Sequence, residues 1–222
     1  LHVSHLGLSR DLAPSALLQI VKEMGVEACL AAVDEALRID WVECKDFCKK
    51  NKMKQPKSSI RFSLLAFGKA PLGIDSGEFP ALSSKFKGAT VKCINAYVAD
   101  LCYRKNTGTE IARVRALCTW AYQTWFHVLD NAEMWVTDYE RSRAVSAGNT
   151  FLLAYQFLAN RARKDKVCLY YVRPKFHVFK HMVLRLAATG RNPRFDASWQ
   201  EEDMVGICKK IGAKTHKSNF AL

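Results

Sequence analysis

Apolar side chains recur at helical spacing along most of this chain, and this pattern constrains the fold more than any other feature. Residues 26–50 show it most clearly, because the far face of that run is charged throughout. Its apolar stripe contains Leu30, Val33, Leu37, Trp41, Cys44 and Cys48. Such a stripe is typical of an amphipathic helix that buries one face against a core. Comparable runs predict further helices at about 86–104, 109–131, 133–163, 174–188 and 199–211.

Proline and glycine mark several of the expected helix boundaries. Pro14 suits the first residue of a short apolar helix near the N-terminus, because the N–H that proline lacks is unpaired at that position anyway. Pro174 suits the first turn of a later helix in the same way, and Gly190 is expected to end that helix. Gly148 interrupts the run over 133–163 and predicts a kink or a division there.

The strand content is expected to be small. Ser59–Phe67 is the only strand candidate, and a short helix is its alternative. Residues 68–84 are a predicted loop rich in Gly, Pro and Ser, and they form the softest possible domain boundary. The sequence therefore predicts a mainly α fold, with one multi-helical domain over 1–222 and at most one or two short strands near 59–67.

The charge of the chain is strongly basic and unevenly placed. The net charge is +13, yet residues 1–44 carry three basic and seven acidic groups, and residues 161–222 carry fourteen basic and five acidic groups. This asymmetry predicts an anionic partner, most often nucleic acid, although a membrane surface or an organellar assembly could use the same charge. No apolar run is long enough to cross a bilayer, and no signal peptide opens the chain. The expected location is intracellular, with the nucleus favoured, and not secreted.

The eight cysteines predict reduced thiols rather than a structural zinc site. No Cys-x-x-Cys pair occurs, which argues against a zinc ribbon or finger. Several cysteines lie within apolar helical patterns and are expected to act as small buried hydrophobic side chains.

Two histidine pairs are candidates for positioning roles. His177 and His181 share one face of a predicted helix and are well spaced for zinc. The glutamate that follows the first histidine of common zinc hydrolases is replaced here by Val178, so a structural or phosphate-contacting role is favoured for each histidine. His2 and His5 could bind a metal or orient a carboxylate, and their alternative is an ordinary polar pair at a frayed terminus.

Three acids, Glu201, Glu202 and Asp203, lie in the first turn of the last predicted helix. They either compensate the helix dipole and cap the helix, or one of them is a ligand for a catalytic divalent cation. The cations nearby are candidate contacts for nucleic-acid phosphates, and the alternative is a solvated basic face over core aromatics. These cations are Arg161, Arg163, Lys164, Lys166, Arg173, Lys175, Lys180, Arg185, Arg191 and Arg194. No Walker loop, Gly-x-Gly-x-x-Gly fingerprint or Gly-x-Ser-x-Gly elbow occurs.

The two ends of the chain together resemble CACTA/Plavaka-type DDE transposases. The segment from Leu1 to Leu12, which contains Leu-His-Val-Ser-His, resembles the stretch just after the second catalytic aspartate of that family. The Lys-x-His-x3-His pattern from Lys175 to His181 resembles a helix late in the family core, and Trp199-x-x-Glu202 resembles the place of the final catalytic glutamate. The chain is also similar to a repeat-derived family abundant in dinoflagellate genomes.

The resemblance implies a ribonuclease H-like core with a large helical insertion, of which this chain is the C-terminal portion. It implies that Glu202 is the third metal-holding carboxylate, with Glu201 as the register-shifted alternative. Asp203 stands where the family usually has Arg. The first two aspartates are expected upstream of Leu1, in line with the missing initiator Met. Mg²⁺ or Mn²⁺ is then expected only when those aspartates are present.

The leading functional hypothesis is a transposase-derived fragment that binds nucleic acid, with DNA favoured. In an intact protein it would contribute Glu202 to a metal-dependent DNA phosphoryl-transfer site, and it is expected to be inactive alone. The alternative is a basic helical assembly subunit of a larger complex that binds RNA or an acidic protein. A small-molecule enzyme centred on His177 and His181 has little support in the sequence.

Overall fold

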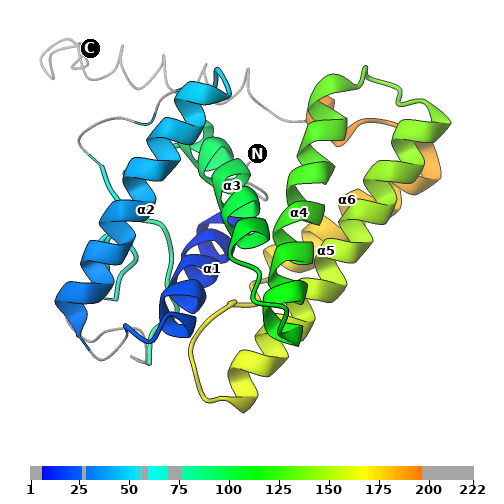
Figure 1. Cartoon of the computed structure of the whole chain (residues 1–222). Helices are drawn as coiled ribbons and strands as arrows, with labels where there is room; N and C mark the ends of the chain where they lie inside the picture. The colour runs from blue at the N-terminus through cyan, green and yellow to red at the C-terminus, as the bar shows by residue number, and fades with distance from the viewer. Residues whose placement is uncertain (1–6, 27–28, 55, 57–59, 70–76, 197–222) are drawn as a thin grey trace, which may run out of the picture.

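The regular structure of the described residues includes six α-helices and one short 3-10 helix (Figure 1). The computed structural model describes residues 7–26, 29–54, 56, 60–69 and 77–196. Its helices are α1 (Ser9–Glu23), α2 (Leu30–Lys50), α3 (Gly88–Arg104), α4 (Glu110–Asn131), α5 (Asp138–Lys164), α6 (Lys175–Thr189) and the 3-10 helix η2 (Pro193–Asp196). The predicted mainly α, multi-helical domain is confirmed, and these ranges contain no strand. None of the helices described is long and apolar enough to span a membrane.

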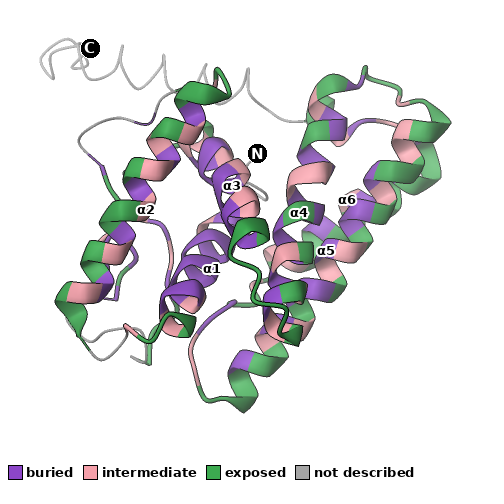
Figure 2. Cartoon of the chain, in the orientation of Figure 1, coloured by how far each residue is buried: buried purple, intermediate pink, exposed green. Residues whose placement is uncertain are grey.

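The first helix, α1, lies at the centre of the molecule. α3 lies beside it, α2 lies on one side of this pair, and α4, α5 and α6 lie on the other (Figure 1). Figure 2 shows α1 buried along most of its length, whereas α2 is buried along one stripe only. That stripe matches the predicted one except at Leu30, which is exposed as the first residue of α2. One continuous apolar core therefore joins both sides of the molecule through α1.

Pro14 lies inside α1 rather than at its start, so its predicted position is wrong. A proline inside a helix leaves the carbonyl four residues earlier without its usual donor. That carbonyl, of Arg10, accepts a hydrogen bond from the backbone N–H of Leu82 at 2.9 Å, and Arg10 Nε donates to the Leu82 carbonyl at 2.7 Å. The loop before α3 thus replaces the bond that Pro14 removes.

The strand candidate forms no strand over its described residues, 60–67. Its apolar side chains are nevertheless buried, and Phe62 packs edge-on against Trp41 of α2 with 4.8 Å between ring centroids. The backbone N–H of Leu64 donates to Asp34 at 2.7 Å, and that of Phe67 donates to Ser63 at 3.0 Å. The apolar side chains of this segment therefore pack against α2 without forming a strand, because turn and side-chain hydrogen bonds use its backbone N–H groups.

Gly148 neither kinks nor divides α5, which runs unbroken from Asp138 to Lys164. A Cβ atom at this position would lie 2.6 Å from Val183 Cγ2 and 3.1 Å from the ring of Trp125. Gly148 therefore allows α4 and α6 to approach α5 closely at this point, and its lack of a side chain serves packing rather than bending.

The end of α6 is fixed against the end of α4. Gly190 ends α6 with a left-handed φ of 67°, as predicted from its position. The buried side chain of Asn192 then donates to the carbonyls of Leu129 and Ala132 at 2.9 and 3.3 Å. These bonds satisfy carbonyls at the end of α4 that have no partner within the helix.

Candidate nucleic-acid interface

Some of the predicted site residues lie outside the described part of the chain. These are the expected carboxylates Glu201 and Glu202, with Asp203 beside them, and the N-terminal histidines His2 and His5. The ten candidate phosphate-contacting cations and the pair His177 and His181 all lie within the described residues. The geometry of the site is therefore built from the end of α5, the segment 165–174 and α6.

A polar stripe along the buried α1 positions the segment between α5 and α6. The stripe consists of Asp11, Ser15, Gln19 and Glu23, spaced four residues apart and therefore on one face of the helix. Ser15 Oγ accepts a hydrogen bond from the backbone N–H of Tyr170 at 2.9 Å, and Gln19 Oε1 accepts one from the Tyr170 hydroxyl. Each member of the stripe thus bonds to a residue far along the chain.

Tyr170 is the residue on which this segment turns. Its backbone has a φ of 56°, in the left-handed region that side chains rarely adopt, and its ring is fully buried. The ring packs edge-on against Tyr155 of α5 with centroids 5.7 Å apart. The bonds to α1 and this contact hold the strained turn in place and aim the next residue, Tyr171, outward.

Arg173 is bound to α1 by a bidentate ion pair with Asp11. The two nitrogen–oxygen distances are 2.6 and 2.9 Å, and the Asp11 side chain is 1% exposed. Burial raises the pKa of Asp11 above its ordinary value, and the hydrogen bonds and charge of Arg173 oppose that rise. The same hydrogen bonds raise the pKa of Arg173. Because Asp11 neutralises its charge, Arg173 fixes the segment before α6 to α1 and attracts a phosphate only weakly.

Five of the ten candidate cations are paired with acids. The pairs are Arg161 with Asp165, Arg173 with Asp11, Arg185 and Arg191 with Asp196, and Arg194 with Asp130. The acids neutralise these arginines locally, and two of the pairs, Arg173 with Asp11 and Arg194 with Asp130, join segments distant in sequence. The sequence alone does not show which cations form ion pairs, because partners such as Asp11 and Asp130 lie far from them along the chain.

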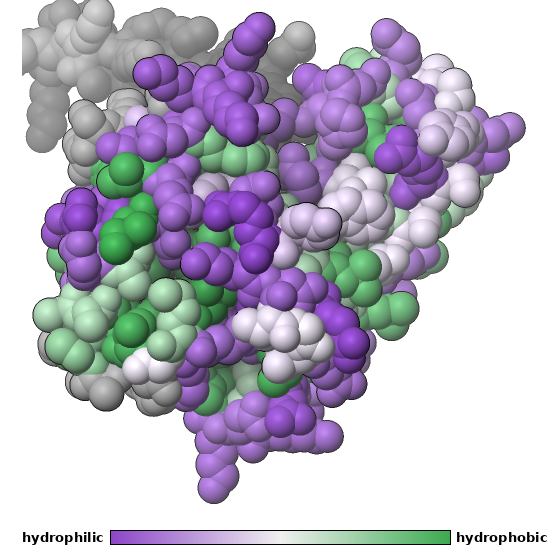
Figure 3. Space-filling view, in the orientation of Figure 1, coloured by the Kyte–Doolittle hydropathy of each residue, from purple (hydrophilic) through white to green (hydrophobic). Residues whose placement is uncertain are grey.

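Four cations have no acidic partner among the described residues: Arg163, Lys164, Lys166 and Lys180. All four are exposed, and Arg163 is steadied by a hydrogen bond to Asn160 Oδ1 at 3.0 Å. Lys175 lies near the ion pair of Asp11 and Arg173, where its charge opposes the rise in the pKa of Asp11. Figure 3 shows hydrophilic side chains covering the lower tip of the molecule, where α5 ends.

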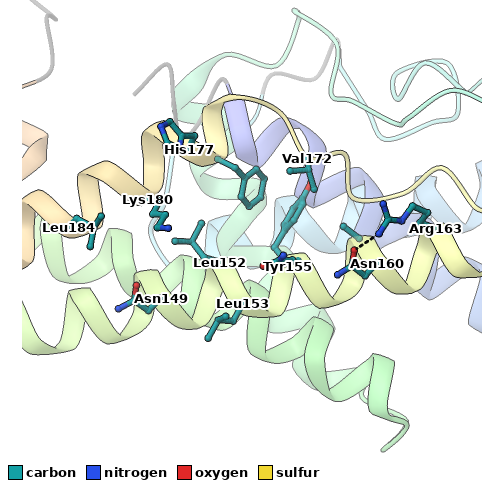
Figure 4. A pocket seen from close by; sticks show the side chains of 13 residues that line it. Asn149, Leu152, Leu153, Tyr155, Asn160, Arg163, Val172, His177, Lys180 and Leu184 are labelled. Atoms are coloured by element: carbon teal, nitrogen blue, oxygen red, sulfur yellow. Dashed lines mark hydrogen bonds between the residues drawn. The ribbon is translucent and has the colours of Figure 1, made fainter.

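A groove of about 900 Å³ runs between α5 and α6, and we call it the α5–α6 groove. Figure 4 shows Lys180 reaching from α6 toward α5, with Arg163 at one end of the groove and Leu184 at the other. Its lining is mostly apolar and includes Leu152, Leu153, Val172 and Phe176. Three of the predicted site residues, Arg163, His177 and Lys180, are therefore brought to one concave surface.

A second hollow of about 380 Å³ adjoins the groove and shares Arg163 with it; we call it the aromatic hollow. Phe79 and Tyr171 stack there with ring centroids 4.6 Å apart, and each is 40% exposed. The guanidinium of Arg173 lies 4.9 Å from the centroid of the Tyr171 ring. Lys166 completes the basic rim. Phe79 is not among the residues predicted from the sequence, because it lies in a loop about ninety residues before its stacking partner.

The predicted histidine pair forms on the exposed surface of α6. The Nε2 atoms of His177 and His181 are 2.9 Å apart, and their rings meet edge-on with centroids 4.3 Å apart. One imidazole therefore donates to the other, and His177 also lines the α5–α6 groove. Among the described residues, no cluster of three or more His, Cys, Asp or Glu side chains is arranged to hold a metal ion.

The cysteines agree with their predicted role as buried apolar side chains. Cys44, Cys48, Cys93, Cys102 and Cys118 are buried, Cys168 is partly buried and Cys29 is exposed. Burial raises the pKa of Cys102 to about 11, so this thiol stays protonated.

The α5–α6 groove and the aromatic hollow form one continuous candidate interface, because Arg163, Asn160, Ala159 and Val172 line both. Its chemistry combines cations that have no acidic partner among the described residues with exposed stacked aromatics and an apolar floor. Comparisons with protein-family models, with curated proteins and with solved structures gave no match to this chain.

Proposed function

We propose that this chain binds nucleic acid, with DNA favoured, through the α5–α6 groove and the aromatic hollow. The observation that carries the proposal is the position of the cations without acidic partners. Three of them, Arg163, Lys166 and Lys180, line two adjoining hollows that also present exposed aromatic rings. Cations that no acid neutralises are the ones that can replace the counterions of a phosphate backbone.

The aromatic hollow supplies a second element of recognition. Stacked rings such as Phe79 and Tyr171 offer a face or an edge to an unpaired base, and stacking tolerates any base sequence. The α1 stripe holds Tyr170 and Arg173 in place, so the ring of Tyr171 between them is presented by a fixed segment. Preorganised side chains lose little conformational freedom on binding.

In an intact protein, we further propose that Glu202 completes an Asp-Asp-Glu site for metal-dependent DNA phosphoryl transfer. The transposase-like motifs at the two ends of the chain support this role. Such a site needs carboxylates converging from separate segments to hold Mg²⁺ or Mn²⁺. Because this site needs two carboxylates besides Glu202, we expect the 222-residue chain to bind DNA without cutting it.

A second candidate function is that of a basic assembly subunit that binds an acidic protein partner. The apolar floor of the α5–α6 groove favours it, because Leu153 and Leu184 are 70% and 52% exposed there. An amphipathic helix with acidic flanks would cover these leucines and meet Lys180 and Arg163. RNA remains the alternative nucleic acid for either function.

The test is fluorescence anisotropy with a labelled duplex, a labelled single strand and an RNA of the same sequence. The triple variant Arg163→Ala/Lys166→Ala/Lys180→Ala is expected to bind DNA at least ~10-fold more weakly, since each lost phosphate contact removes counterion release. The matched control is Lys50→Ala/Lys85→Ala/Lys87→Ala, which removes three exposed cations near the end of α2 and the start of α3 (Figure 1).

The control triple variant is expected to bind like the unaltered chain, although it loses the same total charge. Equal weakening in both triple variants would mean that net charge alone attracts DNA, and the proposed interface would be wrong. Binding to none of the three nucleic acids would leave the assembly-subunit function as the better account.

A further inference from the structure

We propose that His177 and His181 form a binding site for a first-row transition-metal ion such as Zn²⁺ or Ni²⁺. Their Nε2 atoms are 2.9 Å apart. Two imidazole nitrogens bonded to one ion at about 2.0–2.1 Å lie about 2.9 Å apart at a square angle and about 3.3 Å apart at a tetrahedral one. The two rings are therefore already at the separation that chelation requires, without any rearrangement of the helix.

The scaffold beneath the pair is rigid. The histidines are four residues apart on α6, and the buried Phe179 and Val183 fix that helix against α4 and α5. Gly190 closes its C-terminal end. Ligands held by a packed helix lose little freedom on binding an ion, which favours a site formed by only two side chains.

Without a metal ion, the two imidazoles form a hydrogen bond with each other. Each neutral imidazole has one donor and one acceptor nitrogen, so a single proton lies between the two Nε2 atoms. A metal ion would replace that proton and release it to solvent. Water would fill the remaining coordination positions, which face solvent because both histidines are exposed. Imidazole nitrogen suits Zn²⁺ and Ni²⁺, whereas Mg²⁺ prefers oxygen ligands.

Isothermal titration calorimetry with ZnCl₂, NiCl₂ or MgCl₂ alone, at about pH 8 where imidazole is mostly neutral, tests the site. The intact chain is expected to bind one equivalent of Zn²⁺ or Ni²⁺ that both His177→Ala and His181→Ala lose. Removing a residue that only hydrogen-bonds to a metal ligand costs ~10–100-fold in metal affinity, so removing one of the two ligands is expected to cost at least ~10-fold.

His127 provides the matched control, because it is an exposed histidine of α4 whose neighbour four residues on is Asn131 rather than histidine. His127→Ala is expected to keep the equivalent that the other two variants lose. Circular dichroism spectra verify the fold of each variant. Unchanged binding of Zn²⁺ and Ni²⁺ in His177→Ala and His181→Ala, or no binding by the intact chain, would overturn the proposal. Neither result bears on nucleic-acid binding, which is measured without these ions.

Discussion

Asp11 and Arg173, 162 positions apart in the chain, form a two-bond ion pair that ties the central helix to the segment leading into α6. Asp11 is almost fully enclosed, whereas Arg173 is partly exposed and lies against the ring of Tyr171. The pair thus joins the buried core to the candidate interface. Its loss is expected to affect both the stability of the fold and the position of Tyr171.

Arg173→Met is expected to lower the free energy of unfolding by about 2–4 kcal/mol at neutral pH, because it leaves a buried carboxylate without its partner. Urea denaturation measures this loss. The loss should shrink at low pH, where Asp11 is protonated and needs no cation. The control is Arg161→Met, which breaks the exposed pair with Asp165 and should cost at most ~1 kcal/mol. A loss at Arg173 no larger than that at Arg161 would contradict the structural role of the pair.

Gly148→Ala is expected to destabilise the fold by about 1–2 kcal/mol, although alanine favours a helix more than glycine does. The reason is the new Cβ atom, which would lie 2.6 Å from Val183 Cγ2. Adding Val183→Ala removes the clashing methyl group, so the double variant should be more stable than the sum of the single losses implies. Strictly additive losses in thermal or urea denaturation would show that the two positions are not in contact.

Asp40 makes the stability of the fold depend on pH. Burial and the charge of Glu43 raise the pKa of Asp40 to about 6, against an ordinary value of 3.8. Between these values the folded chain holds a proton that the unfolded chain has lost, so stability falls as pH rises from about 4 to about 6.

Asp40→Asn is expected to abolish most of that fall and to stabilise the chain at neutral pH by about 1–3 kcal/mol. Denaturation midpoints measured from acidic to neutral pH test this. Asp46→Asn, at an exposed position of the same helix, is the control and should leave the pH profile unchanged. If stability falls as steeply with pH in Asp40→Asn as in the unaltered chain, groups other than Asp40 cause the pH dependence.

Much of the fold could be predicted from the sequence, because helical periodicity is a local signal, and so are Pro174 and Gly190 at the two ends of α6. Pro14 was misplaced since its compensating donor, Leu82, lies in a distant loop. Gly148 was read as a helix breaker, whereas its close contact with Val183 exists only once α5 and α6 pack. These features depend on three-dimensional proximity, which no local pattern encodes.

The candidate site was predictable in part for the same reason. The spacing of His177 and His181 predicts that they share one face of a helix, and the structure confirms it. The role of the basic segment as a nucleic-acid interface stays a prediction. The acids that neutralise half of the candidate cations could not be found from the sequence, nor could the stacking of Phe79 on Tyr171. The expected carboxylates Glu201 and Glu202 lie outside the described residues, so their role stays a prediction.

Tyr171→Ala is expected to weaken binding to single-stranded DNA by about 1–3 kcal/mol, the usual contribution of one aromatic–base stack. Duplex binding should change less, because paired bases are not free to stack. Tyr139→Ala is the matched control: Tyr139 is also exposed and has Arg143 5.5 Å from its ring centroid, but it lies at the opposite end of α5. If both variants bind single-stranded DNA equally well in anisotropy measurements, the aromatic hollow does not contact the DNA.

The 222-residue chain is expected to leave supercoiled plasmid DNA intact in the presence of Mg²⁺ or Mn²⁺, because the proposed two-metal site needs two further carboxylates beside Glu202. Gel electrophoresis of the plasmid measures nicking. Magnesium-dependent nicking that disappears in Glu202→Ala would show that the chain holds a complete catalytic site and would contradict this expectation.

The most direct test of the proposed interface is the salt dependence of duplex DNA affinity. Each phosphate contact contributes about 0.9 to the slope of the logarithm of affinity against the logarithm of salt concentration. Removing Arg163, Lys166 and Lys180 together should therefore lower the magnitude of the slope by about 2–3, and removing Lys50, Lys85 and Lys87 should leave it unchanged. Equal slopes for the two triple variants would contradict the claim that the α5–α6 surface contacts the DNA backbone.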